Sequence, residues 1–128
     1  MFSRNDDNSN YVTRGDAVSF FVSAVNDAGE GHVFRAGDII RMKIFGKKDC
    51  SNVVLKKDFL VDAERERVNV FLTGAETKIG EVLNKPKDYW YEIELNPLTK
   101  PQTIVGYDDN GPKIFRLFPE GGDCEEVV

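Results

Sequence analysis

The sequence predicts an all-β protein, an antiparallel β-sandwich of about seven to eight short strands with one short helix at residues 73–84. Three observations support this class: apolar residues alternate with polar ones, turn residues recur about every 8 to 12 positions, and β-branched and aromatic residues fill the segments between them. The clearest segment is Asp88 to Leu95, where one face carries Tyr89, Tyr91, Ile93 and Leu95. We predict that this segment is the central strand of the sandwich.

The remaining strands are predicted from the same alternation. In residues 39–45, for example, Ile40, Met42 and Ile44 share the face that we expect to be buried. Residues 53–61 are less regular because Lys56, Lys57 and Asp58 interrupt the apolar residues, and such charges are typical of an edge strand. The other expected strands are residues 11–13, 17–25, 32–35, 67–72, 102–107 and 113–118, of which 102–107 is expected to form a hairpin with the central strand.

The helix is predicted from a change of period. Ile79, Val82 and Leu83 have the i, i+3, i+4 spacing of a helix face, and Thr73 with Glu76 matches a capping box. Pro86 ends the segment, because proline disfavours helix in the residue before it. We therefore expect one or two helical turns that cover an open end of the sandwich.

Length and charge indicate one small domain. The chain has 128 residues and a net charge of −5, which disfavours a nucleic-acid partner. No apolar run approaches the ~20 residues of a membrane span and the first residues are too polar for a signal peptide, so we expect a protein made in a cytoplasm, without membrane insertion. We expect a flexible N-terminus over residues 1–10, one β-sandwich domain over 11–121, and an acidic flexible tail over 122–128.

A search for catalytic or metal-binding groups gives no constellation, so we expect neither an enzyme nor a cofactor. His32 lacks neighbours at ligand spacing and is expected on or near the surface, and Cys50 and Cys124 are expected to be reduced thiols. Arg14-Gly15-Asp16 matches an integrin ligand, but Gly-Asp before a strand is better explained as a turn. Asp108 to Gly111 resembles the start of a calcium loop, but Asn-Gly predicts a tight turn there.

Two surfaces are candidates for binding. The outer face of the central strand carries Trp90, Glu92 and Glu94, an aromatic-plus-acid combination that suits sugar; we favour packing and solvent exposure for these side chains. A second surface comes from large apolar residues on the faces opposite the predicted core, which either are covered by the helix and loops or form a protein interface. These residues are Phe21, Phe45, Phe71, Phe115 and Leu117.

From Arg14 onward the chain contains a recognisable order of short motifs. They are Arg14-Gly15-Asp16 with the strand at Val18, Phe20 and Val22; Gly37-Asp38 with the Ile39 to Ile44 strand; Val68, Val70 and Leu72; Thr77, Lys78 and Gly80; Tyr89, Tyr91, Ile93 and Leu95; and Thr103 to Gly106. In this order the chain resembles the N-terminal immunoglobulin-like domains of upper baseplate proteins from tailed phages of Gram-positive bacteria. The resemblance spans about residues 12–121 and has no catalytic motif.

The resemblance implies an immunoglobulin-like sandwich and a non-enzymatic virion or prophage tail component. Such a protein would be made in the bacterial host cytoplasm and act by assembling with other tail or baseplate proteins, with copies of itself, or both. The alternative is a carbohydrate- or host-surface-binding module. The position of Trp90 discriminates between them, because glycan binding needs that ring exposed beside free carboxylates.

Overall fold

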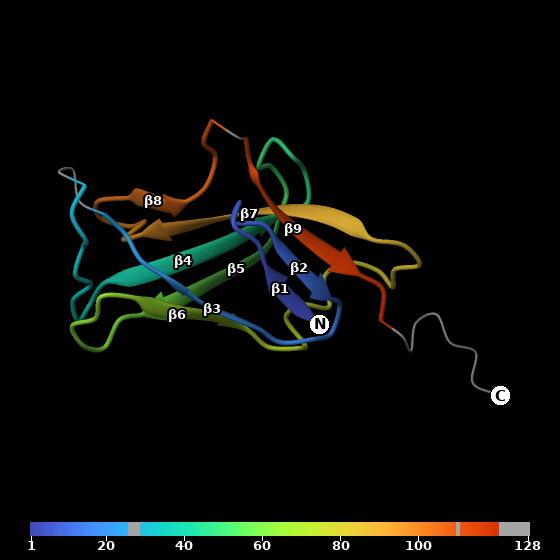
Figure 1. Ribbon diagram of the computed structural model, residues 1–128, viewed down its shortest axis with the longest axis horizontal. Coiled ribbons are helices and arrows are strands. Elements are labelled where there is room, and N and C mark those ends of the chain that lie inside the picture. Colours follow the sequence, from blue (N-terminus) through green and yellow to red (C-terminus); the bar gives the residue numbers. More distant parts are fainter. Residues whose placement is uncertain (26–28, 110, 121–128) are drawn as a thin grey trace.

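The computed structural model describes residues 1–25, 29–109 and 111–120, and the elements in these ranges are all strands (Figure 1). None of the described segments is a helix long and apolar enough to cross a membrane. The nine strands are β1 (Phe2–Arg4), β2 (Asn10–Thr13), β3 (Val18–Val22), β4 (Ile39–Phe45), β5 (Val53–Leu60), β6 (Val68–Leu72), β7 (Lys87–Leu95), β8 (Gln102–Val105) and β9 (Lys113–Phe118).

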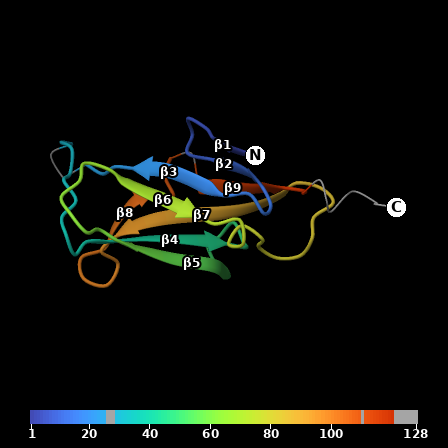
Figure 2. The ribbon, with the colours of Figure 1, turned by 90° about the horizontal axis from the view of Figure 1, so that it is seen from below.

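The strands form two sheets that pack face to face in a β-sandwich-like arrangement (Figure 2). The large sheet has seven strands in the order β1-β2-β9-β7-β4-β5, with β8 also paired to β7, and the small sheet contains β3 and β6. The prediction of purely antiparallel pairing is wrong, because β2 and β9 run parallel. Almost the whole chain separates these two strands, so no tight turn forces them to be antiparallel.

β7 is the central strand of the large sheet, as predicted. It pairs with β4 on one side and with β9 and β8 on the other. Its burial alternates along the whole length: Tyr89, Tyr91, Ile93 and Leu95 are at most 3% exposed, while the residues between them are partly exposed. The predicted hairpin of β7 with residues 102–107 is confirmed by the β7–β8 pairing, although β8 ends at Val105.

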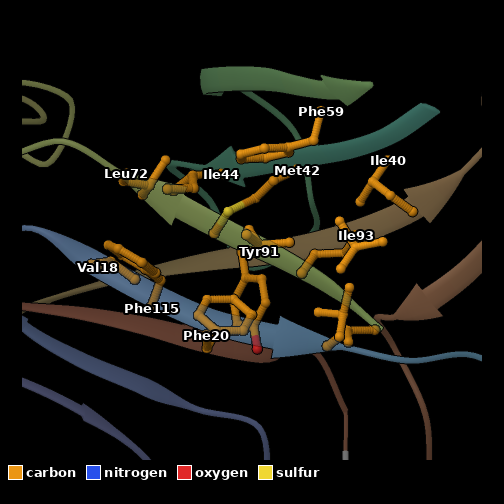
Figure 3. Packing of buried hydrophobic residues seen from close by; sticks show 14 of the residues in the cluster. Val18, Phe20, Ile40, Met42, Ile44, Phe59, Leu72, Tyr91, Ile93 and Phe115 are labelled. Atoms are coloured by element: carbon orange, nitrogen blue, oxygen red, sulfur yellow. The ribbon is translucent and has the colours of Figure 1, made fainter. Parts of the chain in front are cut away.

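The core lies between the inner faces of the two sheets (Figure 3). β4 contributes Ile40, Met42 and Ile44, all fully buried, as the alternation predicted. The rings of Tyr91 and Phe115 meet edge to face at 6.3 Å, which joins β7 to β9 within the core. Complete burial of each such large apolar side chain stabilises the fold by about 2 kcal/mol.

The N-terminal residues take part in the large sheet through β1 and the start of β2. β1 pairs antiparallel with β2, and Ser9 and Asn10 are buried. The guanidinium of Arg4 lies 4.1 Å from the ring centre of Phe20 and donates a 2.9 Å hydrogen bond to the hydroxyl of Tyr91. These partners are distant in sequence, so the local polar composition did not reveal them. The predicted tail at 122–128, with Cys124, lies outside the described residues.

The helix predicted at residues 73–84 is wrong. The capping box does form, since the amide of Thr73 donates to Glu76 Oε1 at 2.8 Å and the amide of Glu76 donates to Thr73 Oγ1 at 3.2 Å. Only a single turn follows, at residues 74–77, and Gly80 adopts a left-handed φ of 68°. Contacts of Thr77 with the 14–16 loop fix this turn, and Val82 of the expected helix face is 63% exposed.

Candidate interaction surfaces

The structure exposes some residues of the predicted second apolar face and buries the others. Phe21 and Phe71 are exposed at 56% and 43%, as expected, and lie on the outer face of the small sheet. The assignment to the outer face is wrong for Phe115 and Leu117, which are buried in the core. Phe45 stands opposite Trp90 in the β4–β7 register, on the predicted outer face, and is covered there at 4% exposed, which was one of the two alternatives. In β9, the strand register buries the opposite set of residues from the predicted one.

Phe71 and Phe21 border an open hollow of about 520 Å³ between β5 and β6, which we call the β5–β6 hollow. The edge of β5 and the residues after it form one wall, and the edge of β6 and the residues before it form the other. The lining residues are Lys57 to Asp62, Arg65, Arg67, Val68, Asn69, Phe71 and Phe21. Leu60, at the mouth of the hollow, is 71% exposed, so it adds a solvent-exposed apolar side chain to the border of the hollow.

Lys57 crosses the β5–β6 hollow from one wall to the other. It stands opposite Met42 in the β4–β5 register, which places a lysine on the inward face of an edge strand. Its ammonium donates to the backbone carbonyl of Phe71 at 3.0 Å and to Glu76 Oε1 at 2.7 Å, and it lies 4.1 Å from the Phe71 ring centre. Inward-pointing charge on an edge strand limits pairing with other chains, so Lys57 protects the free edge of β5.

Arg67 gives the hollow a local positive charge. Its guanidinium lies 4.4 Å from the ring centre of Phe21, and none of the described residues supplies a carboxylate to it. The two lining aspartates are already engaged: Asp58 with Arg41 at 2.7 Å, and Asp62 with Arg65 at 2.8 Å. A chain of net charge −5 thus presents an uncompensated cation beside exposed aromatic rings.

The outer face of β7 carries Trp90, Glu92 and Glu94, as predicted. Glu94 pairs with Lys43 on β4 at 3.0 Å, so its charge is compensated. Burial, together with the neighbouring Glu94, raises the pKa of the Glu92 carboxyl, although Lys43 opposes this. The Glu92 and Glu94 carboxyl groups therefore interact with each other and with Lys43 of β4. Neither of them lines the hollow that contains the Trp90 ring.

Trp90 instead lines a separate hollow of about 310 Å³ with Tyr107, whose ring is 74% exposed. Asp88, at the same hollow, is held by Arg116 at 2.6 Å, while Lys48 contributes a positive charge. Trp90 is partly exposed, neither covered by loops nor fully open. The sequence interpretation did not single out Tyr107, because it placed this residue at the end of the expected strand 102–107; β8 ends at Val105, and Tyr107 lies in the loop that follows.

The Arg14-Gly15-Asp16 tripeptide forms a loop that is fixed to the rest of the fold through Arg14 and Gly15. Arg14 is 8% exposed and donates hydrogen bonds to the carbonyls of Ile79 and Gly80, at 3.3 and 3.0 Å. The Gly15 amide donates to Thr77 Oγ1 at 3.0 Å, so the loop fastens the 74–80 segment to the sheet. A buried Arg14 is not presented to a receptor, and the turn interpretation is preferred.

The described ranges contain no cluster of three or more His, Cys, Asp or Glu side chains that would hold a metal ion. His32 is half-buried and packs edge-on against Phe34 at 5.4 Å. Cys50 is a free thiol whose pKa is raised by burial and by the nearby Glu92 and Asp49. Comparison with protein-family models, curated proteins and solved structures found no match to this chain.

Proposed function

We propose that this protein is a structural component of a phage or prophage particle, with an immunoglobulin-like fold, that acts in a tail or baseplate by protein–protein assembly and not by catalysis. It is made in the bacterial host cytoplasm and incorporated into the virion. The phage context rests on the sequence resemblance described above. The assembly role is supported by the surface around the β5–β6 hollow.

The observation that carries the assembly role is the exposure of Phe21, Phe71 and Leu60 around one hollow. The same hollow contains Arg67, to which none of the described residues supplies a carboxylate. Aromatic and arginine side chains are enriched where protein interfaces gain most of their binding energy. Single exposed apolar residues need no explanation, but this group borders a concave seam between two strand edges.

The proposal is tested by locating the protein in particles. Bacteria that carry the gene are induced with a DNA-damaging agent, and particles are purified by density gradient and probed with an antibody against this chain. We expect the protein to sediment with tail proteins and to remain bound after a salt wash. Its recovery only as free protein, while particles form normally, would contradict the proposal.

A second candidate, glycan binding, is favoured by the shared hollow of Trp90 and Tyr107. Stacking of aromatic rings on a sugar would place a ligand directly on the one tryptophan in the chain. Intrinsic fluorescence titrated with cell-wall polysaccharide therefore reports binding directly. A saturable change that is lost in Tyr107→Ala would support this function, and an unchanged spectrum would remove it.

A further inference from the structure

Among the described strands β6 pairs with β3 alone, so its other edge faces the β5–β6 hollow without a partner strand. The carbonyl of Phe71 accepts its hydrogen bond from Lys57 of β5, so it points away from β3. In a strand, residues two apart direct their backbone polar groups to the same side, so those of Asn69 point the same way. In the β3–β6 register Ser19 stands opposite Phe71 and Phe21 opposite Asn69, and the side chains of Ser19 and Asn69 make a diagonal contact at 2.8 Å.

The opposite wall of the hollow is also a strand edge. β5 pairs with β4 alone, and the described residues show no backbone pairing between β5 and β6. The two walls are joined by side chains: Lys57 reaches the Phe71 carbonyl, and the rings of Phe59 and Phe71 meet edge to face at 5.2 Å. The β5–β6 hollow therefore lies between two free strand edges, β5 of the large sheet and β6 of the small sheet, and we call this gap the seam.

This geometry selects the kind of polypeptide that fits. A strand entering the seam has β6 on one side and β5 on the other, so both of its edges must be free. The β6 strand of a second copy does not meet this condition, because its other edge is already paired with β3 of that copy. When the two β6 strands pair, the β3 strand of the second copy would clash with β5. The occupant is therefore a single extended segment.

The side chains of the hollow define the chemistry of that segment. Phe59, Phe71 and Phe21 offer apolar contacts, while Arg67 lacks a carboxylate partner among the residues described. Phe71 and Phe21 lie on the outer face of the small sheet, so an added strand with apolar side chains at alternate positions can pack one set of them against these two rings. A carboxylate in the segment would pair with Arg67 and make a charge-assisted hydrogen bond.

We propose that the β5–β6 hollow binds an extended segment of a partner protein, which adds as a strand to β6 and carries alternating apolar residues with a carboxylate opposite Arg67. Strand addition of this type takes affinity from main-chain hydrogen bonds and specificity from alternate side chains. The ammonium of Lys57 gives up the Phe71 carbonyl on binding and keeps its ion pair with Glu76. The inference rests on the proposed assembly function and names the class of partner.

The test uses a displayed library of short random peptides selected on the intact protein. We expect the selected peptides to share apolar alternation and at least one Asp or Glu. Arg67→Glu should weaken their binding at least about tenfold. Lys56→Glu is the matched control, since it makes the same charge change on β5, next to the hollow, but Lys56 does not line the hollow.

A second pair of variants tests the strand edge itself. Asn69→Pro removes an amide that faces the hollow and leaves the β3–β6 ladder its hydrogen bonds, so it should abolish binding of the selected peptides. Ser19→Pro makes the same change on the opposite edge of the same small sheet and should leave binding intact. Circular dichroism establishes whether each variant is folded. If either proline variant is unfolded, the comparison of Arg67→Glu with Lys56→Glu decides whether the hollow is the binding site.

The proposal is overturned if no peptide is enriched, if the enriched peptides are basic, or if they bind Arg67→Glu and Lys56→Glu equally. Loss of binding in Ser19→Pro with retention in Asn69→Pro would also overturn it, because the other edge would then be the site. None of these results removes the assembly function, since the protein would still be found in particles. Absence from particles, with peptide binding intact, would remove the phage assignment and leave the strand-addition site.

Discussion

Replacement of Arg14 by alanine should destabilise the protein strongly, although the residue belongs to a tripeptide that resembles a surface recognition motif. Its guanidinium makes two hydrogen bonds to backbone carbonyls, of Ile79 and Gly80, and lies 3.6 Å from Glu120. A hydrogen bond to a charged group contributes about 1.5 kcal/mol or more, and the ion pair adds less than about 1 kcal/mol. We therefore expect Arg14→Ala to lower the free energy of unfolding by about 3 to 4 kcal/mol.

For a domain of this size, that loss corresponds to a fall in Tm of about 12 to 16 °C. Thermal and urea unfolding followed by circular dichroism measure it. Asp16→Asn is the control within the same tripeptide, because the Asp16 carboxylate pairs with the amino terminus of Met1 in an exposed position. It should cost less than about 0.5 kcal/mol. Equal losses in the two variants, or a negligible loss in Arg14→Ala, would refute the structural role of Arg14.

Three further substitutions test other parts of the fold. Gly80→Ala should cost about 1 kcal/mol more than Gly37→Ala in urea unfolding, because both glycines have positive φ but only the Gly80 methyl group would clash, 2.8 Å from the Tyr89 hydroxyl. Tyr91→Phe should lower stability by about 1 to 2 kcal/mol and speed amide exchange in β1, whose Arg4 would lose a partner; unchanged exchange would show that β1 is held by other contacts. Because burial and Glu94 raise the pKa of Glu92, the folded state retains a proton that the unfolded state releases, so stability falls as pH rises through the raised pKa. Glu92→Gln should therefore be more stable than the parent at neutral pH and equal to it below about pH 4, and a gain that persists in acid would contradict this.

The alternation of residues 88–95 predicted a central strand correctly because one residue set is consistently apolar and the other is not. Both faces of β7 lie where this pattern places them. The pattern failed in β9, where Ile114, Phe115, Leu117 and Phe118 supply apolar residues to both faces. The buried register there includes Lys113, which is 6% exposed and satisfies its charge by pairing with Asp108 at 2.7 Å. The alternation of apolar residues does not reveal this pair, because Asp108 lies in the turn before β9.

The predicted helix failed for a related reason. The capping box formed as expected, but it fixes only one turn of backbone, and short isolated helices are marginal without packing. Thr77 and Arg14 hold the segment to the sheet in a different path, with hydrogen bonds that join positions more than 60 residues apart. Tertiary contacts therefore overrode the helical spacing of Ile79, Val82 and Leu83.

The candidate surface was predicted in part. Exposure of Phe21 and Phe71 follows from alternation in two short strands, but the hollow between β5 and β6 requires the arrangement of the two sheets. Lys57 could have been identified from the sequence, since it alternates with Leu55 and Phe59 on the inward side of a predicted edge strand. A charged residue in that position is typical of an edge strand that is protected against pairing with other chains.

The central claim, that this protein assembles with a particle protein through the β5–β6 hollow, is tested most directly by site-specific photocrosslinking during assembly. The photoreactive residue benzoylphenylalanine is introduced at Phe71, on the rim of the hollow, or at Leu98, which is 71% exposed but lies outside it. We predict a crosslink to one defined tail or baseplate protein from position 71 and none from position 98. Crosslinks of equal yield from both positions, or no crosslink from position 71 in assembled particles, would contradict the account.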